Sequence, residues 1–373
     1  MNYYIFPKNN SKLQISFLFD TDNKDTIFIS HTMVNALTCM NNHIKKYENH
    51  HVKEISKKIN PYEFIFSNVT DTTMPISKIN PHTNIFYELY EIILSYSLFD
   101  NVEMLKEISI LHIGDNSLSV NLLIDTIRNT EFDNKTFLNF KSLDKNKIEN
   151  IDIIDIGFFE CNPNINGNQN NNLIVILLII CLKMNKNGTV IIKLNEITNK
   201  ATIDILYILN NLFEKNILTK PLLSNILNSE SFLICNNFIG KNRMQILKEI
   251  ENVALKIINN AMDVSIISVL KNKIPTLFLT KIEEYNAIFG QQQLESKDQL
   301  INIINNKNKY DKIESLKRTN IQKGIMWCEK YNIPHNNFTE KNIFLNIKPM
   351  SNIVENEHDN QNNMEFAIDA DNC

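Results

Sequence analysis

Four continuous apolar runs, separated by stretches with the length of helices, constrain the fold of this chain more than any other feature of its sequence. The apolar runs are 108–114, 151–159, 189–194 and 229–236. The helix-like stretches between them are 118–128, 172–184 and 201–213. Strands buried on both faces of a parallel sheet are unbroken apolar runs, and their alternation with helices is typical of βαβ units. The pattern predicts an α/β fold with a doubly wound sheet.

The alternation also divides the chain into regions. It occupies 81–240, which we expect to form one α/β domain. Residues 1–80 mix short apolar stretches with polar helices and predict an α+β extension. Residues 241–350 lack the alternation, are expected to be mostly helical, and contain Trp327, which we expect in a core. Residues 351–373 are polar and acidic and predict a disordered tail.

Charge, cysteine usage and hydropathy limit the function classes. The net charge is −4, so the chain lacks the overall basic character of many nucleic-acid-binding proteins, although a local basic patch is compatible with this value. None of the six Cys stands in a C-x-x-C pair, which argues against a zinc site. The longest apolar run, 173–182, is about half the ~20 residues that span a bilayer and predicts a buried helix. Because the N-terminus has no signal-peptide pattern either, we expect a cytoplasmic protein without a membrane partner.

Several short motifs follow one another at characteristic gaps. They are DIGFFECNPNING at 155–167, NGTVIIKL at 187–194 and KPLLSNILNSESFLIC at 220–235. Upstream, PHTNIFYELYEI at 81–92 has the place of a helix before the first strand. In order and spacing these segments resemble the FtsJ/RrmJ-type family of S-adenosylmethionine-dependent RNA 2′-O-ribose methyltransferases, and the flanks resemble its large-DNA-virus branch. The resemblance implies a Rossmann-like methyltransferase domain with additions at both ends.

The resemblance also implies a catalytic tetrad of the type Lys-Asp-Lys-Glu. A ribose 2′-hydroxyl is a very weak acid, so methyl transfer requires its oxygen to be aligned and its proton to be removed. The second Lys of the family matches Lys193, and its Glu matches Glu230. The Asp position holds Glu160, which is one methylene longer, and the first Lys position holds Glu88, which reverses the charge. Three carboxylates around one Lys should raise its pKa and make it a poorer base.

A cofactor loop of the pattern D-x-G-x-x-P-G-G is the next feature that the resemblance implies. Here HIGDNSLS at 112–119 keeps Gly114, which together with Asp115 and Asn116 forms the candidate S-adenosylmethionine-binding set. His112 replaces the acidic residue, and a Leu and a Ser fall near the glycine pair. Glycines in such a loop let the backbone approach a ligand, so side chains in their place are expected to fill the space of the cofactor.

Each of these residues also has an ordinary structural interpretation. Lys193 is compatible with an edge position in solvent, Glu230 with a solvated turn, and Glu160 with a loop acid. The helical pattern favours a surface position for Glu88. His112 is expected to be a packed strand residue rather than a ligand.

Three functions stay open on the sequence alone. The first is an active 2′-O-ribose methyltransferase that acts on RNA, capped mRNA in particular. The second is a pseudoenzyme on the same fold that binds RNA or a partner enzyme as a subunit. The third is an interaction module that has lost its ligands. The residues at 88, 112 and 117–119 favour reduced or lost catalysis and weak or absent binding of S-adenosylmethionine.

Overall fold

The computed structural model describes most of the chain. The described residues are 3–8, 13–20, 27–70, 72–99, 106–130, 132–161, 168–259, 265–305, 310–336 and 338. The motif residues 162–167 and the predicted disordered tail therefore lie outside them. All elements named below belong to one compact unit, residues 1–336.

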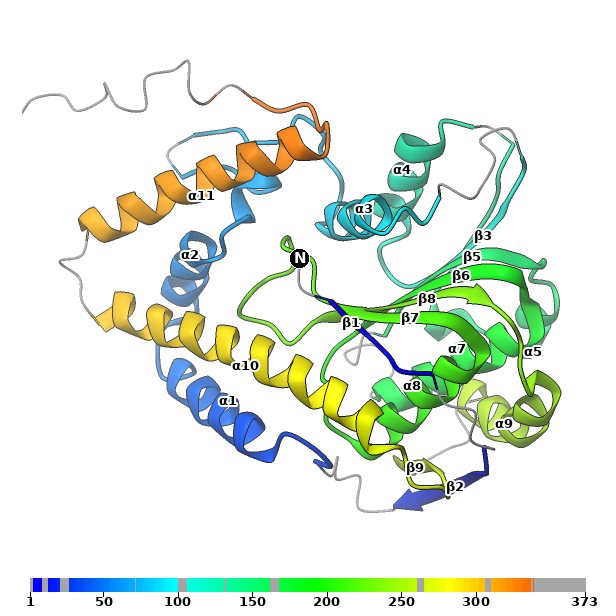
Figure 1. Cartoon of the computed structure of the whole chain (residues 1–373). Coiled ribbons are helices and arrows are strands. Elements are labelled where there is room, and N and C mark those ends of the chain that lie inside the picture. Colours follow the sequence, from blue (N-terminus) through cyan, green and yellow to red (C-terminus); the bar gives the residue numbers. More distant parts are fainter. Residues whose placement is uncertain are drawn as a thin grey trace, which may run out of the picture. The chain divides into compact units, whose positions relative to one another are not determined.

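A mixed sheet forms the centre of this unit (Figure 1). Among the described residues it has seven strands, in the order β1 (Tyr3–Ile5), β7 (Phe213–Thr219), β8 (Ser231–Phe238), β6 (Met184–Leu194), β5 (Ile154–Glu160), β3 (Ser109–Ile113) and β4 (Asn134–Leu138). Strands β4, β3, β5 and β6 are parallel, whereas β8 runs antiparallel to both β6 and β7. The predicted α/β class is confirmed. The reversal of β8 follows from its connection, because a loop rather than a crossover helix joins it to β7.

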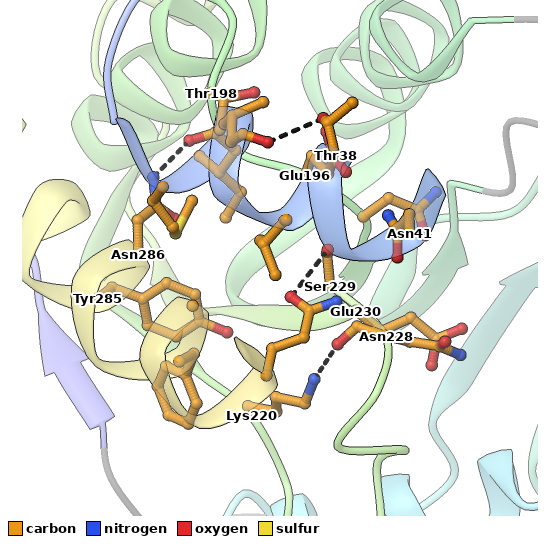
Figure 2. Close-up of a pocket in the computed structure, with 18 residues that line it drawn as sticks. Thr38, Asn41, Glu196, Thr198, Lys220, Asn228, Ser229, Glu230, Tyr285 and Asn286 are labelled. Carbon is orange, nitrogen blue, oxygen red and sulfur yellow. Dashed lines mark hydrogen bonds between the residues drawn. The ribbon is translucent and has the colours of Figure 1, made fainter. Parts of the chain in front are cut away.

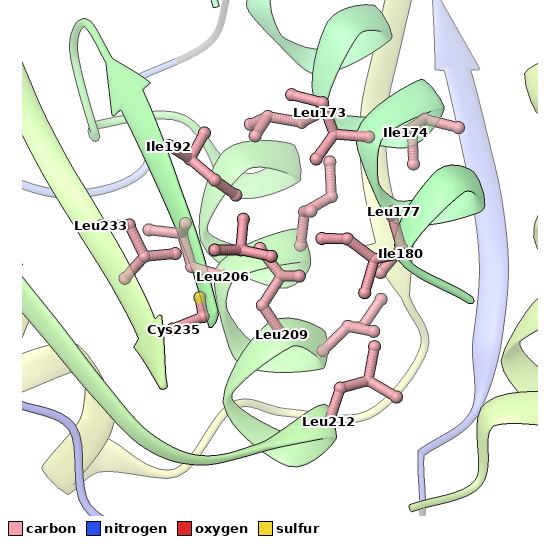
Figure 3. Close-up of a cluster of buried hydrophobic side chains, with 14 of the residues drawn as sticks. Leu173, Ile174, Leu177, Ile180, Ile192, Leu206, Leu209, Leu212, Leu233 and Cys235 are labelled. Carbon is pink, nitrogen blue, oxygen red and sulfur yellow. The ribbon is translucent and has the colours of Figure 1, made fainter. Parts of the chain in front are cut away.

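Helices cover both faces of the sheet. On one face lie α7 (Gln169–Lys183), α8 (Lys200–Leu212) and α9 (Arg243–Ile258), and on the other lie α3 (Ile85–Ser95) and α4 (Ser117–Arg128) (Figure 1). The apolar run 173–182 forms most of α7, where residues 173–181 are all buried, as expected for a helix that is apolar on every side. Figure 3 shows this helix and α8 packed against side chains of the sheet such as Ile192 and Leu233.

The regions on either side of 81–240 pack against each other. Helices α1 (His31–Ile44) and α2 (Asn49–Ile59) lie along the long helix α10 (Thr276–Asn305), and α11 (Tyr310–Lys330) follows, with Trp327 buried as predicted. The mostly helical character of the C-terminal region is confirmed, but that region also contains β9 (Ser265–Leu270). This strand pairs with β2 (Ile15–Asp20), a partner so distant in the sequence that no local pattern indicates the pairing. Shorter elements are η1 (Glu63–Ile65), η2 (Phe140–Ser142) and α5 (Lys145–Glu149).

The strand order fixes where a ligand site is expected. The chain passes from β3 outward to β4 and then returns to β5 on the other side of β3. In open α/β sheets, ligands bind in the crevice beyond the carboxyl ends of the strands at such a reversal. A ligand site is therefore expected among the residues that follow β3 and β5. None of the described helices is long and apolar enough to cross a membrane.

Candidate functional site

Three of the four candidate catalytic residues form an ion-pair cluster at the carboxyl end of β6. The Lys193 ammonium lies 3.0 Å from Glu88 Oε2 and 3.3 Å from Glu230 Oε2. The side chain of Glu88 is fully buried, and those of Lys193 and Glu230 are 17% and 27% exposed. The Phe232 ring lies beside the ammonium, with its centroid 5.6 Å from Nζ. We refer to Glu88, Lys193 and Glu230 as the cluster.

Three different elements bring the cluster together. Lys193 is the penultimate residue of β6, and Glu230 directly precedes β8. Because β8 is antiparallel to β6, the beginning of one strand lies beside the end of the other, and Lys193 pairs with Phe232 in the sheet. Glu88 lies in the first turn of α3, the helix that covers this edge. Glu160 stands opposite Lys193 in the register between β5 and β6.

One expectation from the sequence needs correction. Glu88 is not on a helix surface, because the face of α3 that carries it is turned towards the sheet and the Lys193 ammonium compensates its charge. Helical periodicity does not reveal this position, since most of α3 is buried. The alternative interpretation of Glu230 as a solvated turn residue is not supported, because its carboxylate is the second partner of Lys193.

The electrostatics of the cluster hold Lys193 in its charged form. Burial by itself lowers the pKa of Lys193, but the attraction of Glu88 and then of Glu230 outweighs burial, so the pKa lies above its usual value. A lysine serves as a general base only when its pKa is lowered towards the working pH. The cluster as it stands therefore holds Lys193 as a cation and does not present it as a base.

Glu160 is turned away from the cluster towards the end of β3. His112 Nε2 lies 2.8 Å from Glu160 Oε1, the Asn116 amide N–H donates to the same oxygen at 3.3 Å, and Asn116 Nδ2 donates to Oε2. Burial by itself raises the pKa of Glu160, but the hydrogen bond and attraction of His112 and the bond from Asn116 outweigh it, so the pKa lies below its usual value. His112 is a fully buried strand residue, as predicted, and it also binds this carboxylate.

The crevice between β3 and β5 is filled by this network. A Cβ atom added to Gly114 would lie 2.6 Å from Glu160 Oε1, so the Glu160 carboxylate lies directly against the glycine that the resemblance assigns to the cofactor. The Gly114 amide donates to the Leu138 carbonyl at 3.0 Å, and Asn139 donates to the Asp115 carboxylate. The Gly114 amide, the Asp115 carboxylate and the backbone and side-chain amides of Asn116 are thus bonded within the protein. This arrangement does not fit S-adenosylmethionine.

The two residues in place of the glycine pair behave differently from the expectation. Leu118 is 63% exposed, so Glu160 and not Leu118 is the side chain packed against Gly114. Ser119 is buried because its hydroxyl accepts hydrogen bonds from the backbone amide and the hydroxyl of Thr83. The sequence pointed to this loop but not to the group that fills it.

The dependence of thermal stability on acid pH should reveal the buried contact between Glu160 and His112. A carboxylate whose pKa is lowered by folding stabilises the protein above its unfolded pKa of about 4.3, and this stabilisation is lost as the pH falls through the folded pKa. We therefore expect the thermal midpoint of Glu160→Gln to fall less steeply between about pH 5 and pH 3 than that of the wild type. Glu149→Gln, at a side chain that is 60% exposed, is the control and should follow the wild-type profile. Parallel profiles for wild type and Glu160→Gln would contradict the lowered pKa of Glu160.

A second site lies beyond the cluster, between α1, α10 and the loop that precedes β8. A small cavity of about 90 Å³ there is lined by Lys220, Glu230, Tyr285 and other residues shown in Figure 2. It shares much of its lining with an open groove of about 680 Å³ that also reaches Lys297. Sequence reasoning missed Lys297. The available signal was a lysine on the buried stripe of α10, which continues with Leu300 and Ile304.

Comparisons with known proteins identify no family for this chain. No family model matches the chain, and no curated protein matches it. Among solved structures, the chain is similar to the crystal structure of a putative ribosomal RNA methyltransferase from Plasmodium falciparum. The match has 20% sequence identity and a TM-score of 0.32, and it covers 42% of this chain and 98% of that one. Among the described residues, no group of three or more His, Cys, Asp or Glu side chains is placed to hold a metal ion.

Proposed function

We propose that this protein is an FtsJ-like member of the RNA 2′-O-ribose methyltransferases that has lost methyl transfer and retains RNA binding. The observation that carries the proposal is the Glu160 carboxylate, which lies against Gly114 and is bonded to His112 and Asn116. This carboxylate supports the proposal because it lies against the glycine that the family resemblance assigns to the methyl donor. Service as a subunit of a partner enzyme stays a prediction from the sequence.

The cluster supports the same proposal by an independent route. Transfer to a 2′-hydroxyl needs a group that takes up its proton, and general bases of this kind contribute roughly 10²–10⁴-fold to a rate. Lys193 is held protonated by Glu88 and Glu230, so it lacks the free electron pair of a base. A permanent ammonium can nevertheless donate hydrogen bonds to a hydroxyl or a phosphate oxygen of RNA.

Calorimetric titration with S-adenosylmethionine and with S-adenosylhomocysteine tests the proposal directly. We expect no binding of either compound to the full chain at micromolar concentrations, because binding would require Glu160 to leave three hydrogen bonds and the buried space beside Gly114. Glu160→Gly, which empties that space, is the matched variant and should gain measurable affinity. Micromolar affinity of the wild type would overturn the proposal.

A further inference from the structure

Among the described residues, Lys297 is a buried lysine without a carboxylate partner. Its side chain lies on α10, and the residue is 7% exposed. Within the described part of the chain, no carboxylate lies within 4.0 Å of its ammonium, which donates a hydrogen bond to the Leu227 carbonyl at 2.8 Å. An ammonium has three donors, and an isolated buried charge costs several kcal/mol unless it is compensated. An anionic ligand in the groove would supply this compensation.

Two lysines donate hydrogen bonds to the loop that Lys297 contacts. The Leu227 carbonyl accepts from Lys297 and also from Gln293 Nε2 at 2.7 Å. The next carbonyl, of Asn228, accepts from Lys220 Nζ, as Figure 2 shows. Burial lowers the pKa of Lys297, and burial with the nearby lysines lowers that of Lys220 to about 8 against the opposing attraction of Glu230. Two ammonium groups thus bind neighbouring carbonyls of one short loop, and Lys297 lines the groove while Lys220 lines the adjoining cavity.

The rest of the groove is lined mainly by neutral amides and hydroxyls. These lining residues are Asn168, Gln169, Asn195, Thr198, Asn199 and Asn228. Two carboxylates are also present: Glu230 is paired with Lys193, and Glu196 is exposed to solvent, where water screens its charge. Amides supply both donors and acceptors, which suits ribose hydroxyls and the edges of unpaired bases. A volume of about 680 Å³ lies within the range of sites for a small ligand.

We propose that this groove binds a segment of single-stranded RNA, with one phosphate held by Lys297 and Lys220 and the adjoining nucleotide against the amide lining. The groove also includes Glu230, so a strand bound at the cluster continues into it without a break. RNA as the ligand rests on the function proposed above, whereas the anion site itself rests on the buried lysine. Lys297 lies on α10, outside the segments that carry the family resemblance.

Fluorescence anisotropy with a labelled oligouridylate of about eight nucleotides tests the inference on the full chain. We expect Lys297→Met to weaken binding at least about tenfold, the effect of losing a charge-assisted hydrogen bond. The slope of log affinity against log salt should fall by about 0.7, the value for one phosphate contact on a single strand. Lys281→Met is the matched control, since Lys281 lies on the same helix but pairs with Glu284 on the surface, and it should bind like the wild type.

Stability and competition separate this role from a structural one. Met has a similar length without the charge, so Lys297→Met should unfold at the same temperature as the wild type or higher, whereas a lysine that merely anchors the loop would leave a less stable variant. Inorganic phosphate and uridine monophosphate should compete only at far higher concentration than the oligonucleotide. Equal competition by free phosphate would refute RNA as the ligand.

Two further measurements keep the inference testable if Lys297→Met fails to fold. Lys220→Gln, at a half-buried side chain, should also weaken RNA binding. In the wild type, affinity should fall from pH 7 to pH 9, because burial lowers the pKa of Lys220 to about 8 and the residue loses its proton in that range. Glu196, Glu230 and Lys297 line the same cavity and groove. Unchanged affinity in both experiments would overturn the site, whatever the titration with S-adenosylmethionine shows.

Discussion

Incubation of the wild-type protein with labelled S-adenosylmethionine and capped RNA should give no methyl transfer above background. Two defects act together, the carboxylate against Gly114 and the protonated Lys193, and their effects on the rate multiply. Loss of a general base alone costs roughly 10²–10⁴-fold, and a filled cofactor crevice removes the reaction. Glu88→Lys should not restore activity by itself, because it corrects the charge of the cluster and leaves Glu160 in place.

A combined variant has the best prospect of regaining transfer. It joins Glu88→Lys with Glu160→Asp, which shortens the side chain beside Gly114, and with glycines at Leu118 and Ser119. Lys193→Arg is the control in each background, since arginine keeps the ion pairs of the cluster but does not give up a proton near neutral pH. Clear wild-type transfer that disappears in Lys193→Arg would refute the loss of catalysis.

Replacement of Lys193 by Met should destabilise the protein by about 3–5 kcal/mol, because it leaves the fully buried Glu88 carboxylate without a cation. The free energy of unfolding at neutral pH, measured by urea denaturation, would show the loss. The double variant Lys193→Met with Glu88→Gln should recover much of it, because no buried charge is then left unpaired.

The other carboxylate of the cluster supplies the comparison. Glu230 is partly exposed, and a pair of this kind contributes about 0–1 kcal/mol. Glu230→Gln should therefore cost far less than Lys193→Met. If Lys193→Met and Glu230→Gln lowered the free energy of unfolding by the same small amount, water would be compensating the charge of Glu88. The interpretation of the cluster as a buried ion pair would then fail.

The sequence was informative where a local pattern has one structural meaning. Unbroken apolar runs predicted β3, β5 and β6 and the buried helix α7 because the inner strands and that helix are covered on all sides. The order of short motifs placed Lys193 and Glu230 near each other, and their ammonium and carboxylate lie 3.3 Å apart. Both inferences depended on residues close together in the sequence or on a family pattern of fixed spacing.

The remainder depended on contacts between distant residues. Glu88 lies on α3 with apolar neighbours around the whole helix, so periodicity did not distinguish a buried carboxylate from a surface one. Whether Glu160 turns towards Lys193 or towards Gly114 is decided by His112, through a bond across neighbouring strands. The sequence does not distinguish Lys297 from other lysines, because lysine on a helix is ordinarily solvated. Its burial arises from the packing of α10 against a loop some 70 residues earlier.

The position of β8 has a consequence for how the chain is made. This strand is the last of the main sheet to be synthesised, yet it lies between β6 and β7, which both precede it. Until residues 231–238 leave the ribosome, β6 and β7 each present an unpaired edge, and such edges pair readily with foreign strands. β1 is among the first residues made, and it likewise has no strand partner until β7 has been synthesised. A chain truncated just after Glu230 would contain every residue of the cluster, yet its sheet would be open between β6 and β7, and such a chain is a natural substrate for chaperones.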